Sequence, residues 1–91
     1  MSSSYTVEFT KSAKKEFDRL PSRVKNSVLE CLAILVQNPF TKILAIKKLK
    51  IVKNLYRVRL GDYRVVYELR RNSLLVVVIK VGHRREVYRF L

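Results

Sequence analysis

The sequence of 91 residues is poor in several residue types, with one cysteine, two glycines, two prolines and no tryptophan. A single cysteine, Cys31, excludes an intrachain disulfide, and we expect a reducing, cytoplasmic setting. With only Gly61 and Gly82, the chain has no glycine-rich phosphate loop. Its longest fully apolar run, residues 74–79, is far shorter than the about 20 residues that cross a bilayer. The N-terminus also lacks the basic-then-apolar pattern of a signal peptide.

Groups that commonly carry catalysis are also scarce. His83 is the only histidine, and no Cys, His or acidic residues have the spacing of metal ligands. No Ser-His-Asp set is indicated. We therefore expect no metal and no cofactor. We interpret Cys31 as a core residue on a helix, because a buried cysteine behaves as a small hydrophobe.

Acidic residues are few, and the charge is strongly one-sided. Seven Asp and Glu stand against twenty Lys and Arg, giving a formal net charge of +13. Residues 1–45 hold seven basic and four acidic residues (net +3), and residues 46–91 hold thirteen and three (net +10). This balance predicts a polyanionic partner, most often nucleic acid, or an acidic protein. A solvated surface is the simpler interpretation for the lysines of the predicted loop, namely Lys47, Lys48, Lys50 and Lys53.

Three consecutive strands are predicted at residues 55–60, 63–70 and 74–81. Gly61-Asp62 has the residues of a tight hairpin turn, and residues 71–73 form a second turn. The third strand is almost wholly apolar, so we expect it inside the sheet and covered on both faces.

Alternation along these strands divides the residues between two faces. One face carries basic side chains and is predicted to gather Arg57, Arg59, Arg64 and Lys80. The other face is predicted to be the core, led by Tyr56, Val58, Val65, Tyr67 and Leu69. We expect Arg64 to be a surface residue that contributes little to stability.

The first half of the chain predicts a strand at residues 5–9 and two helices. The first helix follows a cap at Thr10 or Ser12 and ends at Pro21, and the second, residues 23–37, is capped by Ser22. Residues 40–54 are interpreted as a loop anchored by Leu44, Ile46, Leu49 and Ile51. The order β-α-α-β-β-β predicts one domain, residues 1–91. Its fold is an α+β sandwich, with a helical hairpin packed on an antiparallel meander sheet. The arginine face is then open, or covered by something else.

A basic face with tyrosines, followed by residues 82–88, fits chemistry on RNA. Arginines beside a scissile phosphate stabilise the negative charge that develops there. A tyrosine or histidine can stack on an extruded base. RNA supplies its own nucleophile, the 2′-hydroxyl, so a metal-free enzyme could cleave it and leave a cyclic phosphate and a 5′-hydroxyl.

The motifs YRVRLGDYRVVYEL and VGHRREVY, within residues 55–88, resemble the RelE toxins of bacterial and archaeal toxin–antitoxin systems, in the RelE/ParE superfamily. The resemblance covers nearly the whole chain. It implies a ribosome-dependent endonuclease that cuts mRNA in the A site. It also implies a RelB-type antitoxin partner that wraps the toxin in a heterotetramer, and the +10 charge of residues 46–91 predicts that the binding segment of this partner is acidic and amphipathic. Two alternatives stay open, namely a ParE-type gyrase poison and a basic RNA- or protein-binding module without catalysis.

The resemblance also implies roles for individual residues. Arg57 and Arg59 match two basic positions on the strand that enters the active surface. Arg64 matches the arginine that binds the scissile phosphate, and Arg84 matches the basic residue near the leaving group. Tyr88 matches the tyrosine that stacks on or orients the nucleotide.

One departure from the family leaves the general base open. The best-known members carry lysines where this chain has Arg57 and Arg59, and arginine stays protonated. His83 is a substitute with a pKa near neutrality, although a lone histidine at a strand end is more often structural. We also expect Lys80 and Arg85 to contact RNA.

Overall fold

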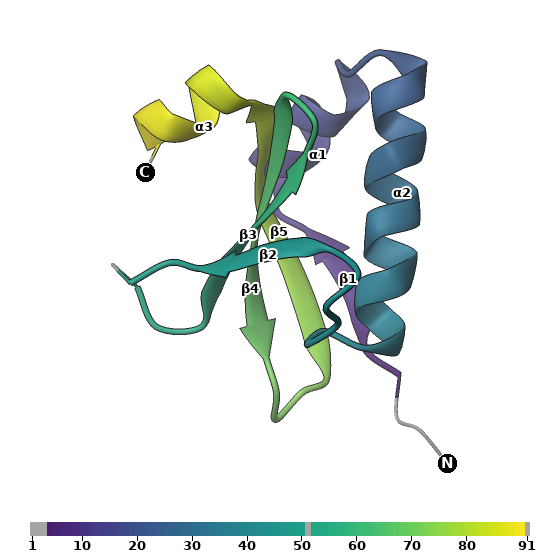
Figure 1. The fold of residues 1–91 in the computed structure, drawn as a ribbon, viewed down its shortest axis with the longest axis vertical. Coiled ribbons are helices and arrows are strands. Elements are labelled where there is room, and N and C mark those ends of the chain that lie inside the picture. The colour runs from purple at the N-terminus through teal and green to yellow at the C-terminus, as the bar shows by residue number, and fades with distance from the viewer. Residues whose placement is uncertain (1–3, 51, 91) are drawn as a thin grey trace.

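The computed structural model describes residues 4–50 and 52–90. Its elements follow the order β-α-α-β-β-β-β-α (Figure 1). They are β1 (Thr6–Phe9), α1 (Lys11–Asp18), α2 (Ser22–Gln37), β2 (Ala45–Lys48), β3 (Leu55–Leu60), β4 (Tyr63–Arg70), β5 (Leu75–His83) and α3 (Arg84–Phe90). No helix in the described part of the chain is long and apolar enough to span a membrane.

The five strands form one sheet in the order β1-β5-β4-β3-β2. The predicted meander β3-β4-β5 is confirmed as antiparallel, while β1 runs parallel to β5. Strand β5 therefore lies inside the sheet, and its valines at 76, 77, 78 and 81 are buried. This agrees with the apolar pattern of residues 74–81.

Helices α1 and α2 cover one face of the sheet and form the main core with it (Figure 1). Tyr67, Val58 and Leu35 are each fully buried in this core. Cys31 also lies there, 2% exposed, and burial raises the pKa of its thiol to about 11. The α+β sandwich and the core position of Cys31 are confirmed.

The helix boundaries differ slightly from the predicted ones. Thr10 caps α1, since its side-chain oxygen accepts a hydrogen bond from the backbone nitrogen of Ala13 (3.2 Å). Helix α1 ends at Asp18, before Pro21. The prediction that Ser22 caps the second helix is wrong, because Ser22 is its first residue and Pro21 occupies the cap position.

Two elements were not predicted. Residues 45–48, assigned to a loop, form edge strand β2, because their backbone pairs with β3 and Ile46 packs against the core. Residues 84–90, for which no helix was predicted, form α3 on the side of the sheet away from α2 (Figure 1). There Val87 packs with Leu55 and Val66 in a second, smaller cluster. Ile51 lies outside the described residues.

Candidate functional site

The face of the sheet opposite α1 and α2 carries a ladder of basic side chains. Directly paired residues on adjacent strands share a face, and Arg59 on β3 is paired with Arg64 on β4. Two residues before Arg59 on the same strand, Arg57 is paired with Val66 of β4, and Val66 is in turn paired with Lys80 of β5. The four residues that alternation predicted to share a face therefore do so.

Strand β2 adds one more cation to this face, because Lys47 is paired with Arg57. We call the resulting set the basic face: Lys47, Arg57, Arg59, Arg64 and Lys80. Sequence reasoning missed Lys47 because it assigned residues 40–54 to a loop. The apolar residues 44, 46 and 49 do not keep strict alternation, so the strand had only a weak signal.

Arg64 is buried rather than exposed, which corrects the expectation of a surface residue. Only 6% of its surface is exposed. Its Nη1 donates to the carbonyl oxygens of Gly61 (2.7 Å) and Tyr63 (3.0 Å), so the guanidinium is held against the β3–β4 turn. Its Nε is buried without a hydrogen-bond partner, and so is the Nε of Arg57. Both side chains carry a guanidinium, a group that binds phosphate well.

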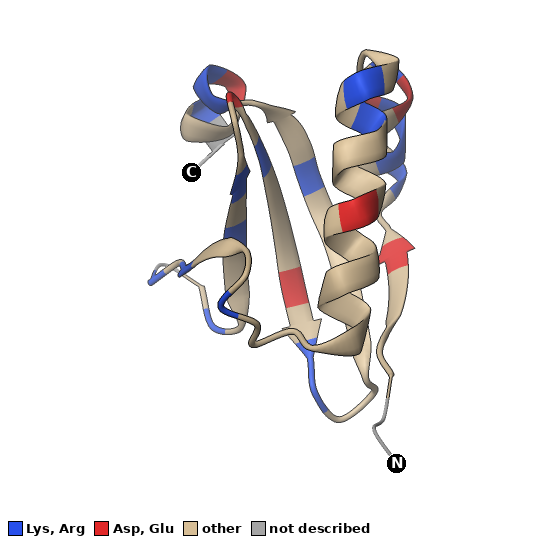
Figure 2. Cartoon of the chain, turned by 45° about the vertical axis from the view of Figure 1, so that its right-hand side comes forward, with Lys and Arg blue, Asp and Glu red and all other residues tan. Residues whose placement is uncertain are grey.

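The positive charge of the basic face has little compensation from acidic side chains. Among the ion pairs of the described residues, only the one between Lys80 and Glu16 includes a member of this face. Glu68 of β4 is engaged by Arg70 (2.8 Å). Figure 2 shows Lys and Arg along the strands with few Asp or Glu among them. Such a face attracts a polyanion.

Helix α3 closes one end of the basic face. Gly82 of β5 is paired with Arg64, and a Cβ at Gly82 would lie at an ordinary contact distance of 3.4 Å from Glu86 Oε2, so α3 packs against β5 beside Arg64. The backbone nitrogen of Arg84 donates to the carbonyl oxygen of Asp62 (2.7 Å). The Gly61-Asp62 turn thus holds both the Arg64 guanidinium and the first residue of α3.

The remaining α3 residues predicted for the site are exposed. Arg84 and Tyr88 are four residues apart in the helix, so they lie on the same side of it, and Tyr88 is 55% exposed. Arg85 is also exposed, and its backbone nitrogen donates to Nδ1 of His83 (3.3 Å).

The structure places His83 on the opposite face of the sheet from Arg59 and Arg64. It is paired with Tyr63, and the two rings make an edge-to-face contact at 5.6 Å. Tyr63 packs against the core formed with α1 and α2, so His83 belongs to the helix-covered side at the end of the sheet.

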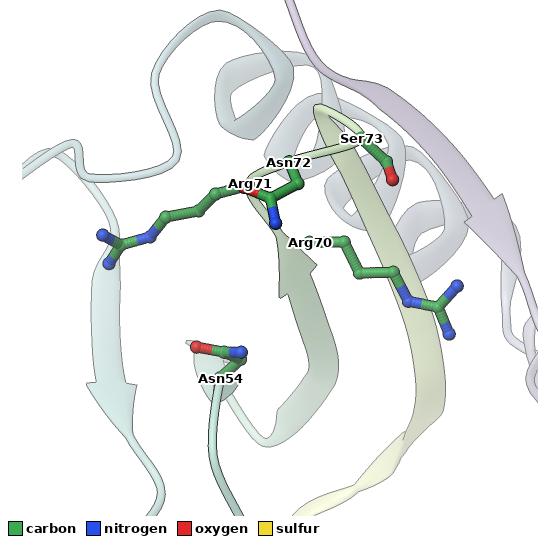
Figure 3. A pocket seen from close by; sticks show the side chains of 5 residues that line it. All are labelled: Asn54, Arg70, Arg71, Asn72 and Ser73. Atoms are coloured by element: carbon green, nitrogen blue, oxygen red, sulfur yellow. The ribbon is translucent and has the colours of Figure 1, made fainter.

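A polar pocket at the far end of β4 offers a second set of arginines (Figure 3). It has a volume of about 410 Å³ and is lined by Asn54, Arg70, Arg71, Asn72 and Ser73. The two arginines point in opposite directions (Figure 3). Arg70 binds Glu68, and Arg71 lies over the ring of Phe40 at 4.8 Å. Because both cations already have partners, this pocket is a weaker phosphate site than the basic face.

Comparison with known proteins decides the family. A family model described as the ParE toxin of type II toxin-antitoxin systems matches residues 7–88. The chain belongs to the RelE/ParE toxin family. This toxin is 33% identical over 92 residues to the toxin RelG of Mycobacterium tuberculosis, covering 93% of this chain and 97% of RelG. It is 31% identical over 88 residues to the mRNA interferase toxin RelE of Escherichia coli K12, covering 92% and 90%.

The fold leads to the same group of proteins. The toxin superposes on the archaeal RelE of the RelE–RelB complex from Pyrococcus horikoshii OT3 with a TM-score of 0.78. The two chains are 31% identical, and the match covers 92% of this toxin and 97% of that chain. The predicted resemblance to RelE toxins is confirmed.

Proposed function

We propose that this toxin is an endoribonuclease that cleaves mRNA in the ribosomal A site and so inhibits translation. The observation that carries the proposal is the pairing of Arg59 with Arg64 on a face with little acidic compensation. Like charges placed directly opposite each other destabilise a sheet, and a bound phosphate backbone removes that cost. A relative named mRNA interferase toxin RelE supports the same substrate.

In the proposed mechanism the arginines act on the scissile phosphate. Arg64 is held by the turn carbonyls with its Nε unengaged, and it stabilises the charge that builds up on the phosphate. Arg84, whose backbone is bonded to the same turn, stabilises the leaving oxygen. Tyr88 stacks on the nucleotide, and Lys47, Arg57 and Arg59 hold the flanking backbone.

The nucleophile in this proposal is the 2′-hydroxyl of the RNA, so the reaction needs no metal-bound water. The 2′-oxygen bonds to phosphorus as the bond from phosphorus to the 5′-oxygen breaks, and the proton lost by the 2′-hydroxyl is balanced by one gained by the 5′-oxygen, so the products are a cyclic phosphate and a 5′-hydroxyl. We leave His83 out of the catalytic set, because its ring packs on Tyr63 at the helix-covered side. Lys80 is bound to a carboxylate, and we assign it a supporting role rather than direct contact with RNA.

We further propose a RelB-type antitoxin as the partner, because the similar archaeal RelE was solved in a complex with RelB. Its binding segment should be acidic and amphipathic, to match the +10 charge of residues 46–91. A heterotetramer of two toxins and two antitoxins is the expected assembly.

The second candidate is a ParE-type gyrase poison, since the matching family model carries the ParE name. The arginine ladder beside α3 favours RNA chemistry over this alternative. Induction of the toxin in growing cells separates the two. Cleaved mRNA without a DNA-damage response supports the proposal, whereas filamentation and a DNA-damage response with intact mRNA contradict it.

A further inference from the structure

The C-terminal half of β5 extends beyond the end of β1, the strand that is paired with one edge of β5. β1 is paired with β5 only as far as Val78, and the next bond runs from the nitrogen of Thr10 to the oxygen of Val78 (3.0 Å). β5 continues to His83, so this part of its edge faces α1 instead of a strand. Backbone N–H groups along such an edge need another acceptor.

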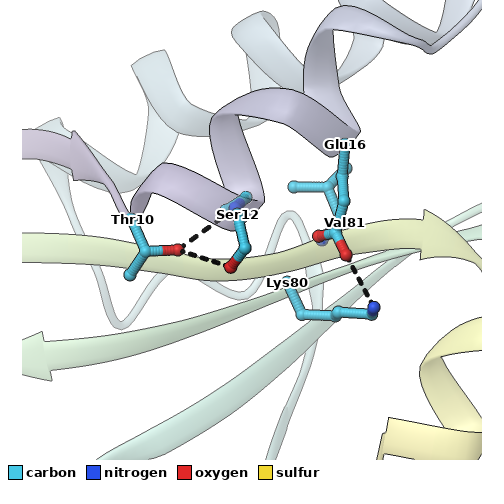
Figure 4. Close-up of polar contacts among 6 residues, drawn as sticks. Thr10, Ser12, Glu16, Lys80 and Val81 are labelled. Carbon is cyan, nitrogen blue, oxygen red and sulfur yellow. Dashed lines mark hydrogen bonds and ion pairs between the residues drawn. The ribbon is translucent and has the colours of Figure 1, made fainter.

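Glu16 of α1 supplies that acceptor (Figure 4). Its Oε1 accepts a hydrogen bond from the backbone nitrogen of Val81 (3.1 Å), and its Oε2 pairs with Nζ of Lys80 (2.6 Å). The two ionic side chains are only 26% and 21% exposed. Both carboxylate oxygens are therefore engaged by β5, in charge-assisted bonds that are stronger than neutral ones.

The residue that Glu16 holds is next to the proposed catalytic machinery. Val81 precedes Gly82, which is paired with Arg64, and Arg84 begins α3 three residues after Val81. A displacement of this edge would shift Arg84 relative to Arg64. A misplacement of about 1 Å can cost a hundredfold in rate.

We infer that Glu16 is a positioning residue. Its carboxylate fixes the free edge of β5 and thereby sets where α3 carries Arg84 and Tyr88 over the basic face. The expected decrease in catalytic rate rests on the proposed function, whereas the placement of α3 can be measured without any activity.

The surroundings indicate that the fold would survive loss of this carboxylate. The side chain of Val81 is 1% exposed and anchored in the main core. Its backbone edge, in contrast, borders a cavity of about 360 Å³ whose lining includes Glu16, His83 and Glu86. Without the carboxylate, water can enter at this edge and compete for the amide.

Two substitutions separate the two bonds of Glu16. Glu16→Gln keeps an oxygen for the Val81 amide but removes the ion pair with Lys80. Glu16→Ala removes both. Glu30→Ala is the matched control, because it removes the same charge from an exposed position on α2.

Amide hydrogen exchange and NMR spectra of the full chain give the first readout. We expect Glu16→Ala to speed exchange at Val81 by about tenfold or more, since a hydrogen bond to a charged group is lost, and to shift the amide resonances of α3. Glu16→Gln should keep most of the protection at Val81, and Glu30→Ala should match the wild type. Unchanged Val81 exchange and α3 resonances in Glu16→Ala would overturn the inference.

Cleavage of mRNA on ribosomes gives the second readout. Glu16→Ala should lower kcat by about tenfold to a hundredfold with little change in KM, because positioning acts after binding, and Glu16→Gln should restore most of kcat. A change in KM alone, or a decrease in kcat that is equally large in Glu16→Gln, would show an effect of charge and contradict a positioning role. If the wild type cleaves no mRNA, the proposed function fails, and the α3 resonances alone decide whether Glu16 positions the helix.

Discussion

Arg59 and Arg64 are paired on adjacent antiparallel strands, so two guanidinium groups share one rung of the sheet. Like charges placed directly opposite each other destabilise a sheet. Arg64 is also 94% buried, from its exposed fraction of 6%, which adds a desolvation cost. The bonds from Arg64 to the carbonyl oxygens of Gly61 and Tyr63 offset part of the desolvation cost, and in the proposed function a bound phosphate offsets the repulsion between the two guanidinium groups.

Arg64→Met should abolish mRNA cleavage while leaving the free energy of unfolding within about 1 kcal/mol of wild type. Methionine keeps the packing but removes the buried charge, which compensates for the lost bonds to Gly61 and Tyr63. Arg70→Met is the control, since Arg70 lies on the same strand at the far end. Urea unfolding and a cleavage assay test both. An active, folded Arg64→Met protein would remove Arg64 from the site.

Lys47→Met should weaken RNA binding and reduce its salt dependence, because Lys47 belongs to the basic face. Loss of one phosphate contact lowers the slope of log K against log salt by about 0.7 for a single strand. Lys48→Met is a matched control, since the adjacent side chain points to the other face of β2. The measurement is filter binding to single-stranded RNA at several salt concentrations. Equal effects of the two substitutions would exclude a specific role for Lys47.

His83→Gln should leave kcat within a few-fold of wild type, because the imidazole packs on Tyr63, on the face of the sheet opposite Arg59 and Arg64. A general base typically contributes about a hundredfold to ten-thousandfold. The pH profile of cleavage is the decisive readout. Loss of activity by about a hundredfold, together with loss of the pH dependence near neutrality, would restore His83 as the base.

Cys31 makes stability depend on pH in the alkaline range. Burial raises the pKa of its thiol from 9.0 to about 11, so the folded state binds the proton more tightly than the unfolded state. The resulting contribution to the free energy of unfolding is fully present below pH 9. It is lost as the pH rises to 11, which lowers the free energy of unfolding by about 3 kcal/mol at most. Urea unfolding of wild type and Cys31→Ala from pH 8 to 11 tests it. Burial also raises the pKa of Tyr67. Because wild type and Cys31→Ala both contain this tyrosine, its effect cancels when their pH curves are compared. Parallel pH curves would contradict the prediction.

The sequence predicted the shared face because side chains in a strand alternate with a period of two. Arg57, Arg59 and Arg64 could be placed together because each lies on the side of its strand opposite the apolar residues that form the core. The period does not give the register between strands, so the pairing of Lys47 with Arg57 and of Gly82 with Arg64 came only from the structure.

Other features of the site depend on tertiary contacts that leave little trace in a local pattern. Helix α3 has seven residues and is held by the packing of Val87 and by the bond from Arg84 to Asp62. The burial of Arg64 results from its bonds to the turn carbonyls, whereas hydrophobic patterning treats every arginine as exposed. Glu16 meets Val81 across 65 residues of sequence.

Primer extension on a defined mRNA in a reconstituted translation system shows directly whether this toxin cleaves mRNA in the ribosomal A site. Wild type, Arg64→Met and Arg70→Met would be compared with and without ribosomes. We expect cleavage at the A-site codon only when ribosomes are present, and we expect it to be lost in Arg64→Met and kept in Arg70→Met. Intact mRNA in every condition, from a wild-type toxin that still arrests growth in cells, would contradict the proposed function.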